Sequence, residues 1–258
     1  MVERIGSRRI QSLERALDVL QALQRGPRRV SDLARDTGSS KATVHHILAT
    51  LEARRIVVRE PGSFRYQLSW GIYELGAGVV HGTGYNSVIP PLISELAEEI
   101  GETTLFAIEE SGEALVLYRG ECTTSVLVAN NIPGRRIPMH ATASGKTLLA
   151  HSPHLLRRLA TTLPAYTPKT AITRQAVERQ LQAVRRRGFA TCWEEHEISL
   201  NSIAVPIFGV ADVLAGALTI AGPSGRLNQR TYRQYLTPLA ETAQRIHEHV
   251  DLPAACQT

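Results

Sequence analysis

The sequence of residues 31–51, SDLARDTGSSKATVHHILATL, predicts two short helices joined by a tight turn. Ser31 is the expected N-cap of the first helix, because its hydroxyl can accept a hydrogen bond from a free N–H of the opening turn. Gly38 is expected to end that helix in the left-handed conformation, and Ser39 or Ser40 then caps the second. Apolar residues of the second helix recur at i, i+3, i+4 and i+7 and form one buried stripe: Val44, Ile47, Leu48 and Leu51.

The other side of the second helix is polar and carries small hydroxyl and imidazole groups, with one lysine near its start. These residues are Ser39, Ser40, Lys41, Thr43, His45, His46 and Thr50. Such a face suits the major groove of DNA, because short side chains reach base edges and phosphates without holding the helix away. The stretch therefore predicts a DNA-reading helix. The alternative is an ordinary surface helix pair, which many α-rich domains contain.

The flanking segments complete the pattern of a winged helix-turn-helix. A first helix, capped by Ser12, is apolar on one face through Leu23 and stops at Gly26-Pro27. After the helix pair, residues 56–59 and 64–68 predict two strands around a Pro-Gly turn. Arg59 and Arg65 flank the tip of this hairpin, where they are placed to contact phosphates or the minor groove, although each could equally be a solvated charge.

Positive charge is concentrated in the same part of the chain. The 258 residues have a formal net charge of +5, and residues 1–65 hold 13 Lys and Arg against 7 Asp and Glu. The remaining residues are nearly neutral, with a balance of −1. Because attraction to phosphates supplies most of the non-specific affinity for DNA, a basic small domain joined to a neutral large one indicates a DNA reader with a separate sensor.

These patterns divide the chain into three parts. Residues 1–68 form the predicted DNA-binding domain, residues 69–84 a linker helix, and residues 85–258 a separate sensor domain. The linker helix covers residues 69–81, SWGIYELGAGVVH, and is expected to end at the break of residues 82–84. It is too apolar for a free linker. We expect it to pack against another surface, such as its copy in a second subunit.

The third part mixes helices with hairpin-linked strands. A helix opened by Pro90-Pro91 is followed by expected strands at 104–109, 114–118, 125–129, 189–193, 202–208 and 213–220. Further helices are expected around 145–149 and at 153–160, 174–187 and 228–250. This order predicts an α+β, sensor-type fold and excludes a doubly wound parallel sheet.

Composition narrows the class of protein further. The three cysteines are far apart and form no CxxC pair, which argues against a disulfide framework or a cysteine-based zinc site. No apolar run is long enough to span a bilayer, and the N-terminus lacks the apolar core of a secretory signal. We therefore expect a cytoplasmic protein that uses no metal or cofactor and has no membrane partner.

Several of these stretches resemble the IclR family of bacterial transcriptional regulators. QSLERALDVLQAL, SDLARDTGSSKATVHHILATLEARRIV and FRYQLSWGIYELGA look like its winged helix-turn-helix and linker helix. IPMHATASGKTLLA, RRRGFATCWEEHE and SIAVPIFGVADVLAGALTIAGPSGRL are similar to its effector-binding domain. The resemblance implies a regulator, and no enzyme, that binds double-stranded operator DNA as a homodimer or homotetramer. It also implies a GAF-like C-terminal domain with a mainly antiparallel sheet, which senses a small molecule, often a carboxylic acid.

Carried over by position, the family's pocket involves the backbone amides of two residues and the side chains or strand positions of four others. These are Ala143 and Ser144, then Cys192, Ser202, Thr219 and Ala221. Free N–H groups at a helix N-terminus attract a carboxylate, which gives the first pair a physical basis.

The chain departs from the pattern of family members that bind very small keto acids. Those members have Asp at the position of Cys192, Cys at that of Ser202 and Ser at that of Ala221. The differences favour a larger or partly apolar acid, such as an aromatic one, over a glyoxylate- or pyruvate-like effector. An Arg is common in the family where this chain has His46, so the operator sequence does not carry over.

The main alternative is a nucleotide-binding or other small-molecule enzyme. Residues 144–147, SGKT, look like the end of a phosphate-binding GxxxxGK loop, but His140 stands where the leading Gly belongs. Lys146 is then expected to be a surface charge on a helix. Residues 194–197, EEHE, are interpreted as a polar turn at the pocket rim, and Cys192 as an inert thiol. His140 either shapes the pocket or is a buried, hydrogen-bonded histidine.

Overall fold

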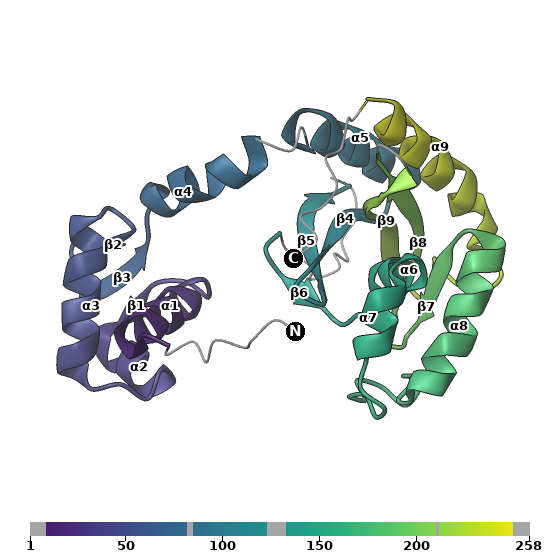
Figure 1. Cartoon of the computed structure of the whole chain (residues 1–258). Coiled ribbons are helices and arrows are strands. Elements are labelled where there is room, and N and C mark those ends of the chain that lie inside the picture. Colours follow the sequence, from purple (N-terminus) through teal and green to yellow (C-terminus); the bar gives the residue numbers. More distant parts are fainter. Residues whose placement is uncertain (1–8, 82–84, 123–132, 210–211, 250–258) are drawn as a thin grey trace. The chain divides into compact units, whose positions relative to one another are not determined.

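A computed structural model describes residues 9–81, 85–122, 133–209 and 212–249 of the chain (Figure 1). The chain divides into two compact units, Met1–Gly82 and Thr83–Thr258. Each unit has its own hydrophobic core, and each is described here by itself.

The N-terminal unit is a winged helix-turn-helix, as predicted. Its elements are α1 (Gln11–Leu23), β1 (Arg28–Arg29), α2 (Val30–Asp36), α3 (Lys41–Ala53), β2 (Val57–Arg59), β3 (Arg65–Leu68) and α4 (Trp70–His81). The three strands form an antiparallel sheet in the order β1-β3-β2. In the core, one face of each of the helices α1, α2 and α3 packs against the β2–β3 hairpin. The polar face of α3 is therefore exposed to solvent.

Helix ends in this unit were predicted only in part. Ser40 is the N-cap of α3, and its Oγ accepts a hydrogen bond from the Thr43 N–H at 3.1 Å. Ser31 is not a cap, because β1 runs straight into α2, which begins at Val30 with Arg29 as its N-cap. Ser12 is likewise inside α1, which begins one residue earlier, at Gln11. Gly38 takes the left-handed conformation, with φ of +63°.

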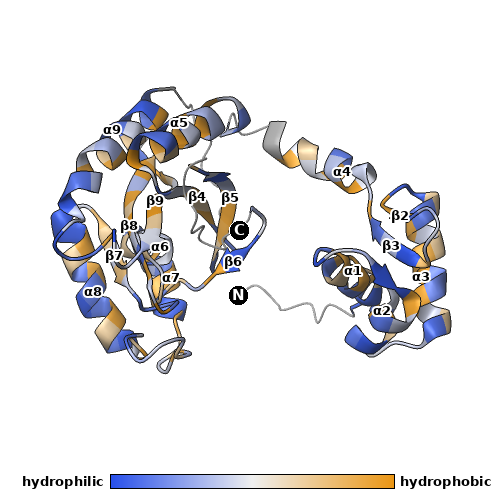
Figure 2. Cartoon of the chain, turned by 180° about the vertical axis from the view of Figure 1, so that it is seen from behind, coloured by the Kyte–Doolittle hydropathy of each residue, from blue (hydrophilic) through white to orange (hydrophobic). Residues whose placement is uncertain are grey.

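Helix α4 leaves the wing and presents apolar side chains to solvent. Its start is held close to α3, since the Ser69 hydroxyl donates to the carbonyl of Arg55. Farther along, Trp70, Tyr73, Leu75 and Val79 are all more than 60% exposed. Figure 2 shows hydrophobic segments along this helix. The predicted break at residues 82–84 lies outside the described residues.

The C-terminal unit contains one mixed set of helices and strands. In chain order these are α5 (Tyr85–Ile100), β4 (Thr103–Glu110), β5 (Glu113–Gly120), β6 (Arg136–Ile137), α6 (Ala143–His151), α7 (Pro153–Arg158), α8 (Arg174–Arg187), β7 (Ala190–Trp193), β8 (Leu200–Phe208), β9 (Leu214–Pro223) and α9 (Arg233–His249). The sheet has six strands in the order β6-β5-β4-β9-β8-β7, and every neighbouring pair is antiparallel. The α+β class is confirmed.

The sheet is covered on both faces, and its residues alternate between two cores. Side chains such as Phe106 and Leu218 pack under α5 and α9, whereas Leu105 and Ala217 face α6 and α8. Helix α6 lies across the middle of this second face and contacts β4, β5, β7, β8 and β9. Every residue of α6 up to Ala150 is buried, so its N-terminus ends inside the protein.

The differences from the sequence prediction include two helix starts and one strand. Pro90 and Pro91 lie inside α5, because burial of Tyr85 and Ile89 in the core supports a turn of helix before them. Helix α9 begins at Arg233 and not at Asn228, whose side chain instead accepts the Arg230 N–H in a turn. The short strand β6 was not predicted. The strand expected at 125–129 lies outside the described residues.

Gly145 permits the close packing of α6, and its replacement tests that packing. A Cβ at this position would lie 2.4 Å from the Met139 Cα and 2.5 Å from the Met139 carbonyl oxygen, both backbone atoms. We expect Gly145→Ala to lower the free energy of unfolding by ~1–3 kcal/mol, measured by urea denaturation. At Gly225 a Cβ would meet no atom within 4 Å, so Gly225→Ala is the control. Equal stabilities of the two variants would contradict the close approach.

Candidate functional site

The outward face of α3 carries the residues predicted to read DNA. Ser40, Lys41, His45, His46 and Thr50 are exposed, and Ser39 and Thr43 are half-buried. Three hydroxyls are already engaged in local hydrogen bonds: Ser40 Oγ lies 2.9 Å from Thr43 Oγ1, and Thr50 Oγ1 donates to the His46 carbonyl at 2.9 Å. The imidazoles and Lys41 are therefore the groups of this face that are freest to contact a ligand.

The wing adds a cluster of arginines. The Arg59 guanidinium lies 4.8 Å from the centre of the exposed Phe64 ring, and its Nε donates to the Ser63 carbonyl, which fixes it at the wing tip. Arg65 lies opposite Arg29 in the β1–β3 ladder. Sequence reasoning missed Arg28 and Arg29, because no pattern in the sequence showed that this pair would form a third strand beside the wing.

A second site lies at the buried N-terminus of α6. Five of the six predicted pocket residues line one small cavity there: Ser144, Cys192, Ser202, Thr219 and Ala221. Ala143 is buried beside them but is not among the lining residues. The volume of the cavity is about 20 Å³, which is room for about one water molecule.

The strand register explains why these residues meet. Cys192, Ser202 and Ala221 occupy directly opposed positions on β7, β8 and β9, so they lie in one row on one face of the sheet. Thr219 belongs to the next row on that face, and its Oγ1 lies 2.8 Å from Ser144 Oγ of α6. The cavity is therefore the space between these two rows and the start of the helix.

Cys192 is a buried thiol. Its side chain donates to the Ala141 carbonyl, with Sγ 3.2 Å from the oxygen, and the residue is 3% exposed. Burial raises the pKa of the Cys192 thiol, which keeps it protonated and weakly nucleophilic. This fits the inert thiol expected from the sequence.

His196 and Glu197 also line the cavity, and sequence reasoning did not include them among the pocket residues. They follow β7 in the run 194–197, which was interpreted as a polar turn at the rim. Burial lowers the pKa of His196, whose ring contacts that of Tyr166 with centroids 5.1 Å apart. They lie in the loop after β7 and form part of the cavity wall.

Lys146 is not a surface charge. Its Nζ lies 2.6 Å from Glu195 Oε1, and the two side chains are 3% and 7% exposed. Glu195 also accepts hydrogen bonds from the Gln180 side chain and the Trp193 N–H. The expectation was wrong because the sequence could not show that α6 is buried on all sides, where a lysine needs a counter-ion.

The same contacts speak against a phosphate-binding loop at residues 144–147. Gly145 serves close backbone packing, Lys146 is neutralised by Glu195, and the Thr147 hydroxyl faces the Ala204 carbonyl. His140 is 4% exposed and one ring nitrogen lies 2.9 Å from the Pro164 carbonyl oxygen, so it is a buried and hydrogen-bonded histidine.

The part of the chain that the structure describes offers neither a metal site nor a membrane-spanning helix. No three His, Cys, Asp or Glu residues within it are grouped so that they could hold a metal ion. None of its helices is both long and apolar enough to cross a membrane.

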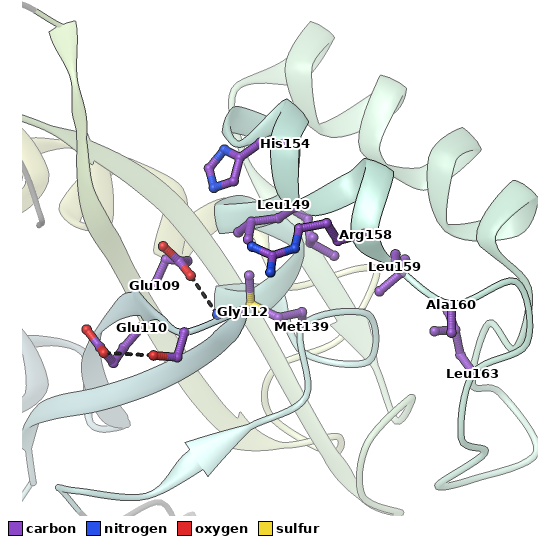
Figure 3. Close-up of a pocket in the computed structure, with 12 residues that line it drawn as sticks. Glu109, Glu110, Gly112, Met139, Leu149, His154, Arg158, Leu159, Ala160 and Leu163 are labelled. Carbon is purple, nitrogen blue, oxygen red and sulfur yellow. Dashed lines mark hydrogen bonds between the residues drawn. The ribbon is translucent and has the colours of Figure 1, made fainter. Parts of the chain in front are cut away.

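A larger cavity, of about 700 Å³, lies between the β4–β5 turn and α7 (Figure 3). Glu109 approaches from the turn, where its carboxylate accepts the Gly112 N–H, while His154 and Arg158 approach from α7. Met139 contributes to its apolar wall. None of the predicted pocket residues lines it, so the cavity at the start of α6 remains the candidate effector site.

The chain thus joins a DNA-binding type of unit to a domain with an internal polar pocket, which is the architecture of a ligand-responsive transcription regulator. Its residues 12–61 match the IclR helix-turn-helix domain, and residues 77–248 match the C-terminal domain of the bacterial transcriptional regulator IclR. The chain belongs to the IclR family of bacterial transcriptional regulators.

Named relatives and solved structures agree with this assignment. The transcriptional repressor AllR of Escherichia coli is 29% identical over 257 residues, which cover 98% of this chain and 94% of AllR. An IclR homologue from Microbacterium hydrocarbonoxydans, solved with 4-hydroxybenzoate, has a TM-score of 0.80 and 25% identity over 92% of this chain and 98% of that one. An IclR-type regulator from Silicibacter has a TM-score of 0.77 and 27% identity over 95% and 98%. These proteins are regulators and not enzymes.

The buried Lys146–Glu195 pair gives a prediction on stability. Lys146→Met alone leaves a buried carboxylate without its counter-ion, and we expect a loss of ~3–5 kcal/mol in the free energy of unfolding. Adding Glu195→Gln removes the stranded charge and should recover much of that loss. Lys169→Met is the control, because Lys169 pairs with Glu194 at the surface and should contribute less than ~1 kcal/mol. Equal losses for Lys146→Met and Lys169→Met would refute the role of burial.

Proposed function

We propose that this protein binds operator DNA through α3 and its wing, and that a small acid bound at the start of α6 changes that binding. The observation that supports it most directly is the pairing of two sites in one chain. One is an exposed helix face of imidazole, hydroxyl and lysine groups beside a wing of arginines. The other is a polar cavity at a buried helix N-terminus.

On the DNA side, the proposed contacts are those of α3 and the wing: Ser39, Ser40, Lys41, Thr43, His45, His46, Thr50, Arg59 and Arg65. The exposed imidazoles are suited to base edges, and the arginines to phosphates or the minor groove. Arg28 and Arg29 join this set because β1 lies beside the wing.

On the effector side, the proposed residues are Ala143, Ser144, Cys192, Ser202, Thr219 and Ala221. The first N–H groups of α6 precede its hydrogen-bond ladder and favour a carboxylate. A cavity of about 20 Å³ holds no acid as it stands, so binding must move the wall formed by His196 and Glu197. The 4-hydroxybenzoate complex of a relative supports a larger, partly apolar acid over a small keto acid.

The exposed residues of α4 support the proposed assembly as a homodimer or homotetramer. These exposed aromatic and aliphatic side chains are what a helix pairing with its own copy would bury. A dimeric reader needs two recognition helices about 34 Å apart, so an effector that alters the pairing of subunits alters affinity for DNA. The proposed domain limits are residues 1–68, 69–84 and 85–258, and the proposed place of action is the cytoplasm.

The DNA-binding proposal predicts the effect of His46→Ala. Fluorescence anisotropy with the DNA upstream of the protein's own gene, against a scrambled duplex of equal length, gives the sequence preference at two salt concentrations. We expect His46→Ala to reduce this preference ~5-fold or more, since a base contact contributes ~1–3 kcal/mol. His154→Ala, an exposed histidine of the other unit, should retain the wild-type preference. Wild-type preference in both variants would rule out this reading face.

The effector proposal predicts the effect of Ser202→Ala. Among the described residues the Ser202 hydroxyl has no hydrogen-bond partner, so its removal should leave stability nearly unchanged. Isothermal titration with benzoate, 4-hydroxybenzoate, pyruvate and glyoxylate should show tighter binding of the aromatic acids, and Ser202→Ala should weaken it ~10-fold or more. Ser152→Ala, at the far end of α6, is the control. Binding of the two keto acids without the aromatic acids would disprove the proposed effector class.

A further inference from the structure

Arg119 on β5 is a buried cation whose hydrogen-bonding capacity is largely unused. Its side chain is 9% exposed. Nε and Nη2 are both buried and have no hydrogen-bond partner in the described part of the chain. The Glu121 carboxylate lies 3.2 Å from Nε, an ion pair, but Glu121 itself is 60% exposed. Burying a guanidinium without hydrogen bonds is costly, so the arrangement needs an explanation.

The sheet register places Arg119 on the face that carries the effector cavity. Arg119 is opposite Leu105 on β4, and Leu105 is opposite Thr219 on β9. Leu105 and Thr219 both line the cavity. The neighbouring Gly120 faces the other way, since a Cβ there would meet the Ile93 carbonyl of α5. Arg119 is therefore two strands from Thr219 in the same row of the sheet.

The contacts of Arg119 do not suggest a structural role. A structural arginine in a core usually binds a carboxylate or carbonyl groups with several of its donors. Among the described residues its ion-pair partner is Glu121, which is mostly solvated, and an exposed pair of this kind contributes little to stability. A buried cation with unpaired donors, whose neighbour Leu105 lines the proposed acid-binding pocket, is instead what a ligand site requires.

We propose that Arg119 binds a second anionic group of the effector. The first anionic group, at the other end of the effector, is bound by the N-terminus of α6. This inference rests on the proposed effector site and names its ligand class: an acid with two separated anionic groups. Neighbouring strands lie ~4.8 Å apart, so the backbones of Thr219 and Arg119 are separated by ~10 Å. Anchors at that separation favour a para-substituted aromatic diacid or a six-carbon diacid over an acid with two carboxylates on adjacent carbons.

The test uses diacids and their matched monoamides as probes on the full chain. Isothermal titration compares terephthalate with 4-carbamoylbenzoate, and adipate with its monoamide. We expect the wild type to bind at least one diacid ~10-fold or more tightly than its monoamide, the ratio given by one hydrogen bond to a charged group. Arg119→Met should bind the diacid and the monoamide equally. Arg136→Met, on the neighbouring strand and the other face of the sheet, should keep the wild-type ratio.

Two results would overturn the inference. One is a wild-type protein that shows no preference for either diacid, or a preference that persists in Arg119→Met. The other is a fall of more than ~4 °C in the Tm of ligand-free Arg119→Met, which would assign the arginine to the fold. We expect an unchanged or higher Tm, because the substitution removes buried donors without partners. Either failure leaves the responses to His46→Ala and Ser202→Ala as they are, so it is distinguishable from failure of the proposed function.

Discussion

The ion pair between Lys146 and Glu195 is the constraint on which the sensor domain depends. A charged residue in a helix with no exposed face must meet its counter-ion inside the protein, and Glu195 provides it at 2.6 Å. The loop that carries Glu195 also carries His196 and Glu197, two walls of the cavity. The ion pair of Lys146 therefore fixes the position of the loop, and with it the part of the cavity wall that His196 and Glu197 form, relative to the start of α6.

The start of α6 brings packing and recognition together. Its N-terminus is deep in the protein because Gly145 lets the backbone approach Met139, and Ser144 is then in contact with Thr219 of the central strand. Three consecutive antiparallel strands bring Cys192, Ser202 and Ala221 into one row of the sheet. The buried end of α6 and the small side chains that face it are thus assembled by one sheet register.

Much of this could be predicted from the sequence, and the failures have physical causes. The spacing of apolar residues such as Val44 and Leu48 predicted the helix α3. The resemblance to a family predicted five residues that line one cavity. The periodicity of apolar residues could not show that Lys146 is buried. Such a pattern distinguishes a buried face from an exposed one, and α6 is buried on every side. Periodicity could not find Arg119 either, since a single arginine in a strand reads as a solvated charge until register assigns its face.

The small size of the proposed effector cavity has a consequence for how strongly any ligand can bind. If the walls are closed in most molecules, a ligand binds only the fraction in which they are apart, and its apparent affinity is reduced by that fraction. The free energy used to separate the walls is also the part that can be transmitted to the rest of the protein. Substitutions that hold the pocket open should therefore tighten ligand binding but weaken the conformational change that the ligand causes. High affinity for the ligand and a large conformational change are thus opposed in this fold.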